Sequence, residues 1–278
     1  MTMHSDSLAP LLDTAIALAR GAGAILLEGL AEIRAGNHGA LRFKSGPGDV
    51  VTEYDQRSED FIVSELRRRY PGHAIVGEEG GAYAAQAPAG EPARYEWQID
   101  PLDGTTNFSH GFAIFSVSIG LLIDGVPSVG VVYSPATSDL YAAARGLGAV
   151  WNGRPVRVSR VDSLERALLI TGFPYDYARS PQNNLRAFDA FNRRAQAVRR
   201  IGSAALDLCL VASGQMDGYW ETKIKPHDIA AGIAIVREAG GVVTDSAGGE
   251  DMLGRGDIVA SNGLIQPVML EVLNSLPV

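Results

Sequence analysis

The chain has little of what several classes of protein require. Its 278 residues include one cysteine, Cys209, which excludes an intrachain disulfide and a cysteine-rich zinc site. Acidic residues outnumber basic ones by 32 to 24, and the formal net charge is -8. Because nucleic acids and anionic membranes favour basic faces, we expect neither of them as a direct partner. Small anionic ligands are not excluded, since bound cations reverse the sign of an acidic pocket.

Export signals are also missing from the sequence. Residues 1–7 lack a cationic region, and Asp13, Arg20 and Glu28 interrupt the apolar stretch that follows, so a secretion signal is not expected. We find no segment that is long and apolar enough to span a bilayer. The sequence therefore predicts a cytoplasmic protein.

The first half of the chain predicts two helices followed by an antiparallel sheet. Apolar residues recur at helical spacing over residues 8–33, before Gly36, and a second helix is expected from Thr52 to Pro71-Gly72. The pairs Asp124-Gly125 and Asn152-Gly153 are strong hairpin signals between apolar runs. Residues 80–94, which are rich in Ala, Gly and Pro, are expected to form an exposed loop.

In the second half, expected strands alternate with helices. The strands are expected at 167–171, 197–201, 219–221, 242–244 and 258–261, and the helices at 184–197, 204–213, 229–239 and 264–273. Such alternation favours a smaller, more parallel sheet covered by helices. We therefore predict an α/β (α+β) fold in one domain, 1–278, with an antiparallel half at about 1–160 and an α/β half at about 161–278.

The segment Asp100-Pro101-Leu102-Asp103-Gly104-Thr105-Thr106 carries the strongest chemical signal. Two carboxylates three residues apart across a turn can converge on one point, and the Leu102 carbonyl can join them as an oxygen ligand. Gly104 permits close backbone approach, and the N–H groups of Thr105 and Thr106 would open a helix and present an anion site. The alternative is an Asx turn with a helix cap.

Further acidic residues lie at strand and helix ends. Glu78-Glu79 follow an expected strand, Asp228 precedes an apolar helix, and Asp55 lies where a helix begins. Taken singly, the glutamates could be a solvated edge and the two aspartates could be helix caps. Together they indicate a metal cluster, because gathered carboxylates need counter-charge. Oxygen ligands without paired His or Cys indicate Mg²⁺ or Mn²⁺ rather than Zn²⁺.

These motifs resemble the signatures of the inositol monophosphatase family. The match is carried by Gly77-Glu78-Glu79, the 100–108 segment and Asp228-Ile229-Ala230-Ala231-Gly232, and it extends over Lys44–Asp55, Gly202–Cys209 and Gly218–Glu221. The resemblance implies a layered αβαβα sandwich with a larger, mainly antiparallel sheet and a smaller mixed sheet. It also implies a homodimer and a lithium-sensitive, magnesium-dependent phosphatase.

The resemblance also implies roles for individual residues. Glu78, Asp100 and the Leu102 carbonyl would hold one Mg²⁺, Asp100, Asp103 and Asp228 a second, and a weaker third ion would lie near Glu78. Lys44 and its glycine-rich loop would lie over the site. Substrate contacts would come from Asp103, Gly104, Thr105, Ser203, Ala204, Glu221 and Asp228.

The implied reaction is hydrolysis of a small polyol phosphate by a metal-activated water. The water near Glu78 would be oriented by Thr105 and Asp55, and inositol monophosphate is the expected substrate, with Glu221 accepting hydroxyl hydrogens. His227 stands where relatives commonly carry Trp, either as a packing substitute or as a change beside the second metal.

Other substrates known within the family stay open. They are histidinol phosphate, fructose 1,6-bisphosphate and 3′(2′),5′-bisphosphate nucleotides. No basic-aromatic element for a second phosphate and a base is evident in the sequence. From a different class, a regulatory partner of the transcription machinery is expected at most as a second function.

Overall fold

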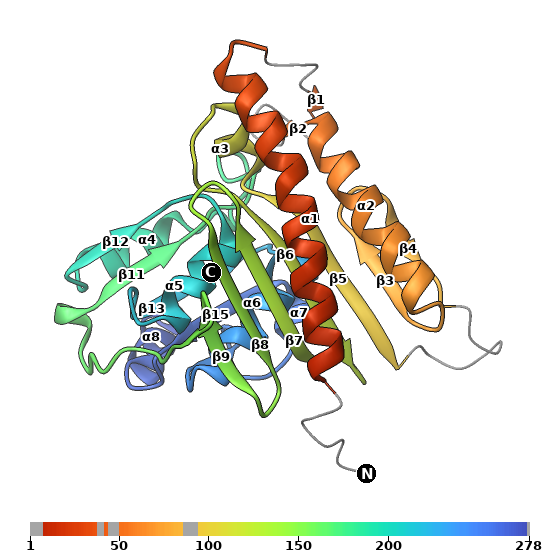
Figure 1. Ribbon diagram of the computed structural model, residues 1–278. Coiled ribbons are helices and arrows are strands. Elements are labelled where there is room, and N and C mark those ends of the chain that lie inside the picture. The colour runs from red at the N-terminus through yellow and green to blue at the C-terminus, as the bar shows by residue number, and fades with distance from the viewer. Residues whose placement is uncertain (1–7, 38–41, 44–49, 86–93, 277–278) are drawn as a thin grey trace.

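The computed structural model describes residues 8–37, 42–43, 50–85 and 94–276. Two long helices, α1 (Ala9–Arg34) and α2 (Glu53–Arg69), lie side by side across one face of a large sheet (Figure 1). Helix α1 buries Ala15, Leu18, Ala22 and Leu26 on one stripe, as the periodicity predicts. Thr52 caps α2, because its hydroxyl accepts the Tyr54 N–H at 3.2 Å.

Helix α1 corrects one expectation about membranes. By length and composition alone it could cross a bilayer, whereas no segment of the sequence was expected to be long and apolar enough to do so. Its apolar stripe is nevertheless packed in the main core against α2 and the sheet, and Ala15 and Ala19 are fully buried. The structure therefore accounts for its apolar character as that of a core helix.

The large sheet has eight strands in the order β10-β9-β8-β7-β6-β5-β3-β4, and only the β3–β5 pair is parallel. Asp124 and Gly125 both have positive φ, as do Asn152 and Gly153, so both predicted hairpin turns are confirmed. The strands are β3 (Ala74–Gly77), β4 (Gly81–Tyr83), β5 (Tyr95–Asp103), β6 (Ser116–Ile123), β7 (Val126–Ser134), β8 (Asp139–Ala144), β9 (Gly148–Trp151) and β10 (Arg154–Pro155).

The small sheet has five strands in the order β12-β11-β13-β15-β14. Strand β11 pairs in parallel with β12 and β13, whereas β15 is antiparallel to both of its neighbours, so the expected mixed sheet is confirmed. The strands are β11 (Leu168–Thr171), β12 (Ala197–Arg199), β13 (Gly218–Thr222), β14 (Val242–Thr244) and β15 (Asp257–Ser261).

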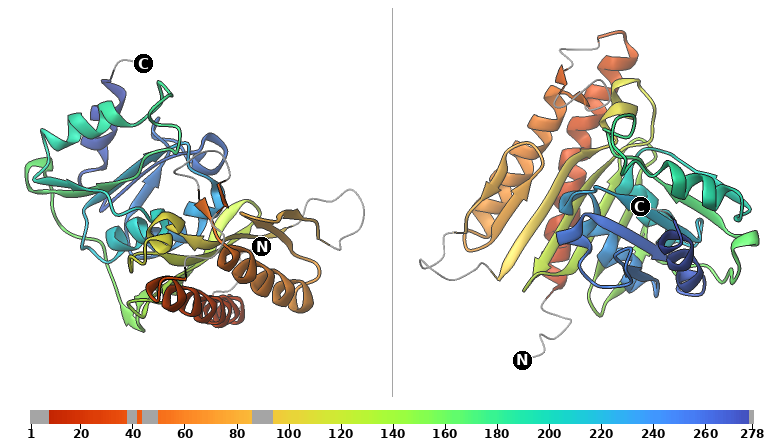
Figure 2. Two further views of the ribbon diagram at one scale, coloured as in Figure 1. Left: turned by 90° about the horizontal axis from the view of Figure 1, so that it is seen from above. Right: turned by 180° about the vertical axis from the view of Figure 1, so that it is seen from behind.

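Two helices, α5 (Ala204–Ala212) and α6 (Pro226–Glu238), fill the space between the sheets (Figure 2). Strand alternation divides the small sheet between two cores: Tyr219 faces α5 and α6, and Trp220 faces α4 (Leu185–Asn192) and α8 (Gln266–Asn274). The described chain thus has five layers, α1/α2, large sheet, α5/α6, small sheet and α4/α8, as the αβαβα expectation requires. The two sheets share the α5/α6 layer between them, and the division into domains stays a prediction.

Several element boundaries differ from the sequence prediction. Helix α4 ends at Asn192 rather than near 197, because Gln196 donates its N–H to the Ala167 carbonyl at 3.0 Å and the chain goes on to pair as β12. Strand β4 lies within the expected loop at 80–94, of which residues 86–93 are outside the described chain. The short elements β1 (Arg42–Phe43), β2 (Val50–Val51), α3 (Thr105–Ser109), α7 (Met252–Arg255) and the 3₁₀ turn Leu164–Arg166 complete the described elements.

Candidate active site

The ends of two parallel strands bring the first acidic residues together. Strands β3 and β5 are parallel neighbours, so their carboxyl ends reach the same edge of the large sheet. Glu78 follows β3, and its N–H donates to the Ile99 carbonyl at 3.2 Å. Glu78 therefore lies beside Asp100, whose side chain is almost completely buried.

The end of β5 is irregular, and this irregularity shapes the site. Pairing with β6 shifts register between Asp100 and Asp103, as at a β-bulge. The Asp100 carboxylate accepts the Leu102 N–H at 3.0 Å, so an Asx turn, the alternative considered from the sequence, does form in this motif. Ser58 of α2 donates to the Pro101 carbonyl at 3.0 Å and fixes this turn from behind.

Gly104 lets the chain turn from β5 into α3. Its φ of 93° lies in the left-handed region. A Cβ at this position would be 3.1 Å from the carbonyl oxygens of both Gly202 and Ile114. The motif therefore needs glycine for its conformation and for close packing, and α3 begins at Thr105, as predicted.

Asp103 reaches across to the helix between the sheets. Its carboxylate accepts the Ser203 hydroxyl at 2.5 Å and the Ala205 N–H at 2.8 Å, and the Ala204 N–H lies 3.3 Å away. Asp103 thus caps α5, to which it is not adjacent in sequence, and ties Ser203 and Ala204 to the metal motif.

Asp228 enters from the start of α6. The backbone N–H of Lys225 donates to its carboxylate at 2.8 Å, which is the helix-cap arrangement considered from the sequence. The Nε2 atom of His227 lies 3.6 Å from the other carboxylate oxygen. Asp228 is therefore held at the helix start and also lines the same cavity as Asp100.

Thr105 connects the cavity to a buried carboxylate behind it. The Thr105 hydroxyl lies 3.1 Å from Asp55 Oδ1 and 2.9 Å from the Leu102 carbonyl oxygen. The other oxygen of Asp55 accepts the N–H and hydroxyl of Thr52, and burial raises the pKa of Asp55 to about 6. Asp55 is thus both a cap of α2 and the partner of Thr105, but it does not itself line the cavity.

One cavity of about 800 Å³ collects nearly all of the predicted site residues. Lys44 lies outside the described residues, so its expected place over the site stays a prediction. The predicted residues that line the cavity are Glu78, Asp100, Leu102, Asp103, Gly104, Thr105, Ser203, Ala204, Glu221 and Asp228.

Glu221 lines this cavity from β13. Its carboxylate accepts the Tyr219 hydroxyl at 2.7 Å, and burial raises its pKa to about 8. Gly172 leaves room for it, since a Cβ there would be 2.2 Å from Glu221 Oε2. The small sheet thus adds a carboxylate to the acids that the large sheet and α6 bring to the cavity.

The acidic end of the cavity, defined as Glu78, Asp100, Asp103 and Asp228, has the donor chemistry of a site for hard cations. Burial raises the pKa of Asp100, Asp103 and Asp228, and the charges of neighbouring carboxylates, Glu78 among them, raise it further. Among the described residues, no three Asp, Glu, His or Cys side chains already enclose a single point. The oxygen-only donors and their mutual repulsion nevertheless fit divalent cations that would bridge them, together with the Leu102 carbonyl.

Comparison with known proteins connects this geometry to a family. The model of the inositol monophosphatase family matches residues 7–277. The chain belongs to this family. An inositol-1-monophosphatase of Synechocystis sp. is 46% identical over 237 residues, 85% of this chain and 81% of that protein. A putative Nus factor SuhB of Neisseria meningitidis serogroup B is 42% identical over 267 residues, 96% of this chain and 98% of that protein.

The fold agrees with that assignment. The solved structure of an inositol monophosphatase from Anabaena (Nostoc) sp. matches with a TM-score of 0.86 and 42% identity, over 98% of both chains. As a member of the inositol monophosphatase family, the chain is a phosphatase acting on phosphorylated small molecules. Members of the family are generally metal-dependent, in keeping with the acidic end of the cavity.

Several cavity residues of this inositol monophosphatase homologue were not predicted to form the site. The guanidinium carbon of Arg200 lies 4.7 Å from the centre of the Phe173 ring and 5.8 Å from that of Tyr177. This basic-aromatic cluster was not evident in the sequence, because it is formed by segments distant in sequence, which pattern alone cannot join. The other unpredicted lining residues include Tyr175, Asp207, Lys223 and Lys225.

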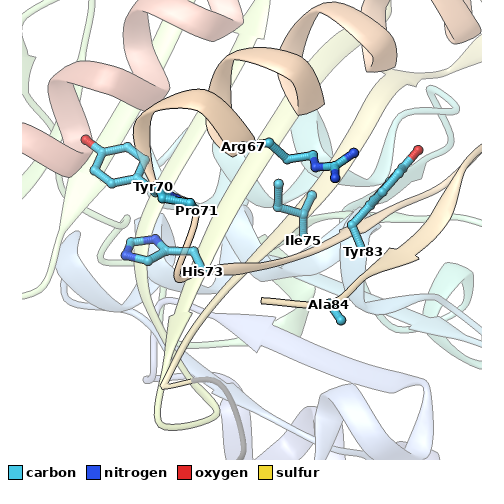
Figure 3. Close-up of a pocket in the computed structure, with 7 residues that line it drawn as sticks. All are labelled: Arg67, Tyr70, Pro71, His73, Ile75, Tyr83 and Ala84. Carbon is cyan, nitrogen blue, oxygen red and sulfur yellow. The ribbon is translucent and has the colours of Figure 1, made fainter. Parts of the chain in front are cut away.

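A second, much smaller pocket lies at the opposite end of β3 (Figure 3). Tyr70, His73 and Tyr83 contribute to its walls. Its volume of about 10 Å³ is that of one water-sized probe, so it does not accommodate a phosphorylated substrate. His73 is satisfied within the fold, because its Nδ1 accepts the Trp97 indole N–H at 3.0 Å.

Proposed function

We propose that the chain hydrolyses the phosphate monoester of a small polyol, with inositol monophosphate as its substrate, and that the reaction requires Mg²⁺ or Mn²⁺. The observation that carries the proposal is the convergence of Glu78, Asp100, Asp103 and Asp228 on one cavity beside the start of α3. These acids come from three separate places in the sequence, so local structure alone does not explain their meeting.

The acidic end would hold the metal ions. Glu78, Asp100 and the Leu102 carbonyl would bind one ion, and Asp100, Asp103 and Asp228 a second, with a third, weaker ion near Glu78. When bound, such ions neutralise the carboxylates, stabilise charge on phosphoryl oxygens and make a water a better nucleophile at neutral pH. Asp100 is the shared residue, and its burial keeps competing water from it.

The protein's own groups would orient the reactants. The N–H groups of Gly104 and Thr105 would donate to phosphate oxygens. The Thr105 hydroxyl, held between Asp55 and the Leu102 carbonyl, would orient the attacking water on the side of Glu78. No covalent phosphoenzyme is involved in this scheme.

The alcohol end of the substrate would lie toward α5 and β13. Ser203 and Ala204 lie at the start of α5, and Glu221 faces the same cavity from β13. A carboxylate there would accept hydrogen bonds from hydroxyls of the leaving alcohol. The hydroxyl-rich inositol ring suits this end of the cavity.

Measuring phosphate release from a small panel tests the proposal. The panel contains inositol 1-phosphate, histidinol phosphate, fructose 1,6-bisphosphate and 3′-phosphoadenosine 5′-phosphate. We expect the highest kcat/KM for inositol 1-phosphate with Mg²⁺, activity with Mn²⁺, and none after chelation. A higher kcat/KM for either bisphosphate would reassign the substrate and give Arg200 and its aromatic partners the role of binding the second anionic group.

A second function is favoured by one comparison. Because a relative sharing 42% identity is named a putative Nus factor, association with the transcription machinery is kept as an additional role. Copurification of the untagged protein with polymerase subunits would support this role. If the Asp100→Asn protein still copurifies with polymerase subunits, the association does not depend on phosphatase activity.

We also propose that the protein is a cytoplasmic homodimer and is inhibited by lithium. One chain has a mass of 29.4 kDa, and light scattering of the purified protein should give twice that mass. Lithium should lower the rate at fixed Mg²⁺. A monomeric, lithium-insensitive phosphatase would contradict these two points while leaving the substrate proposal standing.

A further inference from the structure

Asp207 is a buried acid to which the proposed reaction gives no role. It lies in the first turn of α5, four residues after Ser203, and it lines the active-site cavity. Its side chain is 1% exposed. Among the described residues, no hydrogen-bond partner reaches its Oδ1 atom.

An unpaired buried carboxyl oxygen needs an explanation. Buried polar atoms are nearly always hydrogen-bonded, since removing them from water without a partner destabilises the fold. The other two acids near this helix start do have partners: Asp103 accepts the Ser203 hydroxyl and Glu221 accepts the Tyr219 hydroxyl. Among the described residues, Asp207 is the one of these three acids with a buried carboxylate oxygen that has no partner.

The neighbours of Asp207 place it between Asp103 and Glu221. The charges of Glu221 and Asp103 both act on it and, together with burial, they raise its pKa well above the ordinary value. Asp207 therefore lies in the part of the cavity between the α5 start and β13. Ser203 and Ala204 border the same region.

We propose that Asp207 is a specificity residue that, together with Glu221, binds hydroxyl groups of the leaving alcohol. The proposal rests on the proposed phosphatase function and extends it from one alcohol-binding carboxylate to a pair. A carboxyl group accepts a hydrogen bond from a hydroxyl, and when it is protonated it also donates one. A polyol satisfies both acids, whereas an alcohol without hydroxyls leaves Asp207 unpaired.

The pair explains how the cavity would select its substrate class. A site built to hydrogen-bond a hydroxyl rejects an analogue that lacks it, because the buried polar groups then stay unsatisfied. The phosphate and metal end is shared by every substrate and contributes no such selection. Discrimination between alcohols thus falls to the α5 and β13 side.

The test compares two substrates in the Asp207→Ala protein. Inositol 1-phosphate carries ring hydroxyls, and p-nitrophenyl phosphate carries none. We expect kcat/KM for inositol 1-phosphate to fall by about tenfold or more, mainly through KM, and kcat/KM for the aryl ester to stay within about twofold. Asp207→Asn keeps the volume and one acceptor oxygen, so its loss on inositol 1-phosphate should be smaller.

Cys209→Ala supplies the matched control. Cys209 is fully buried two residues further along the same helix and is not among the cavity-lining residues. It should change thermal stability without changing the ratio of the two kcat/KM values. If Asp207→Ala does not fold, the Asp207→Asn ratio decides in the same way.

The outcomes separate this inference from the proposed function. Equal losses on both substrates, or an unchanged ratio in both Asp207 variants, would overturn the role of Asp207 while leaving the phosphatase proposal intact. A wild-type protein that cleaves the aryl ester but none of the hydroxylated phosphates would overturn the polyol proposal itself, and the role of Asp207 with it.

Discussion

The carboxylate of Glu59 accepts the backbone N–H of Gly80 at 2.5 Å. Its other oxygen accepts the N–H of Glu79 at 2.9 Å, and the side chain is fully buried. Gly77 allows this approach, since a Cβ there would be 2.5 Å from the Glu59 carboxyl carbon. A residue of α2 therefore fixes the turn that carries Glu78, although Glu59 does not line the cavity.

This relationship predicts that Glu59→Gln weakens metal activation. The amide nitrogen would face a backbone N–H in place of an acceptor, so the turn bearing Glu78 should shift. We expect the Mg²⁺ concentration for half-maximal activity to rise by about tenfold, with a lower melting temperature. Glu65→Gln, which weakens ion pairs with Arg68 and Arg69 near the end of the same helix, is the control and should leave Mg²⁺ activation unchanged. Unaltered Mg²⁺ activation in Glu59→Gln would show that the contact serves stability alone.

Removing the Thr105 hydroxyl is expected to lower kcat without weakening metal activation. Thr105→Val keeps the shape of the side chain but removes the hydroxyl that contacts Asp55 and the Leu102 carbonyl. We expect kcat to fall by roughly 10²-fold or more, as for other groups that orient a reacting water, whereas Thr105→Ser should stay active. Steady-state kinetics at saturating Mg²⁺ checks this, and a Val variant with wild-type kcat would remove Thr105 from the mechanism.

The acidic cavity predicts how pH affects stability without metal. Burial raises the pKa of Asp55 to about 6 and of Glu221 to about 8, above their values of 3.8 and 4.5 in an unfolded chain. Between those values the folded protein binds more protons than the unfolded one. The contribution of these two groups to the free energy of unfolding therefore falls as pH rises from about 4 to 8.

The proposed metal ligands should respond to metal in the opposite direction. Burial also raises the pKa of Asp100, Asp103 and Asp228, and ions bind these carboxylates when they are deprotonated, so Mg²⁺ should raise the melting temperature more at pH 8 than at pH 5. Melting curves with Mg²⁺ and with chelator at both pH values give the comparison. An equal Mg²⁺ effect at the two pH values would be inconsistent with ions bound to these acids.

The close packing around Gly104 leads to a prediction that a second glycine with positive φ can control for. Gly104→Ala places a Cβ 3.1 Å from two carbonyl oxygens at a φ of 93°. Gly125→Ala is the matched control, with a φ of 78° and nothing within 4 Å of the added Cβ. Both variants should lose about 1 kcal/mol of unfolding free energy, because alanine is strained at a positive φ. Only Gly104→Ala should lose more and also lose phosphatase activity, as denaturant titrations and phosphate release would measure.

Local patterns were sufficient to predict most of the layers and the metal motif. Helix α1 follows the apolar spacing of residues 8–33, and Asp124-Gly125 marks a hairpin, because both signals depend on neighbouring residues. Helix α4 was predicted too long, since its end is set by pairing of β12 with β11 across the chain. Long-range pairing of this kind is not encoded in local spacing.

The residues of the candidate site also divide into those that local sequence predicts and those that only the fold brings together. Asp55 and Asp228 perform the capping role that local sequence suggests, whereas Asp103 caps α5, which is distant in sequence. Each of the three also reaches the cavity or a residue that lines it. The two interpretations are therefore compatible rather than alternative. Asp207 and Arg200 were not predicted, because only the fold brings them beside Glu221 and Phe173.

The most direct test of the metal-centred account is phosphate release by the Asp100→Asn protein at saturating Mg²⁺. Asp100 is the residue that both proposed main metal sites share, and the substitution keeps its volume. The account predicts a folded protein with a melting temperature near that of the wild type and no measurable turnover of inositol 1-phosphate. Wild-type turnover by this variant under those conditions would contradict it.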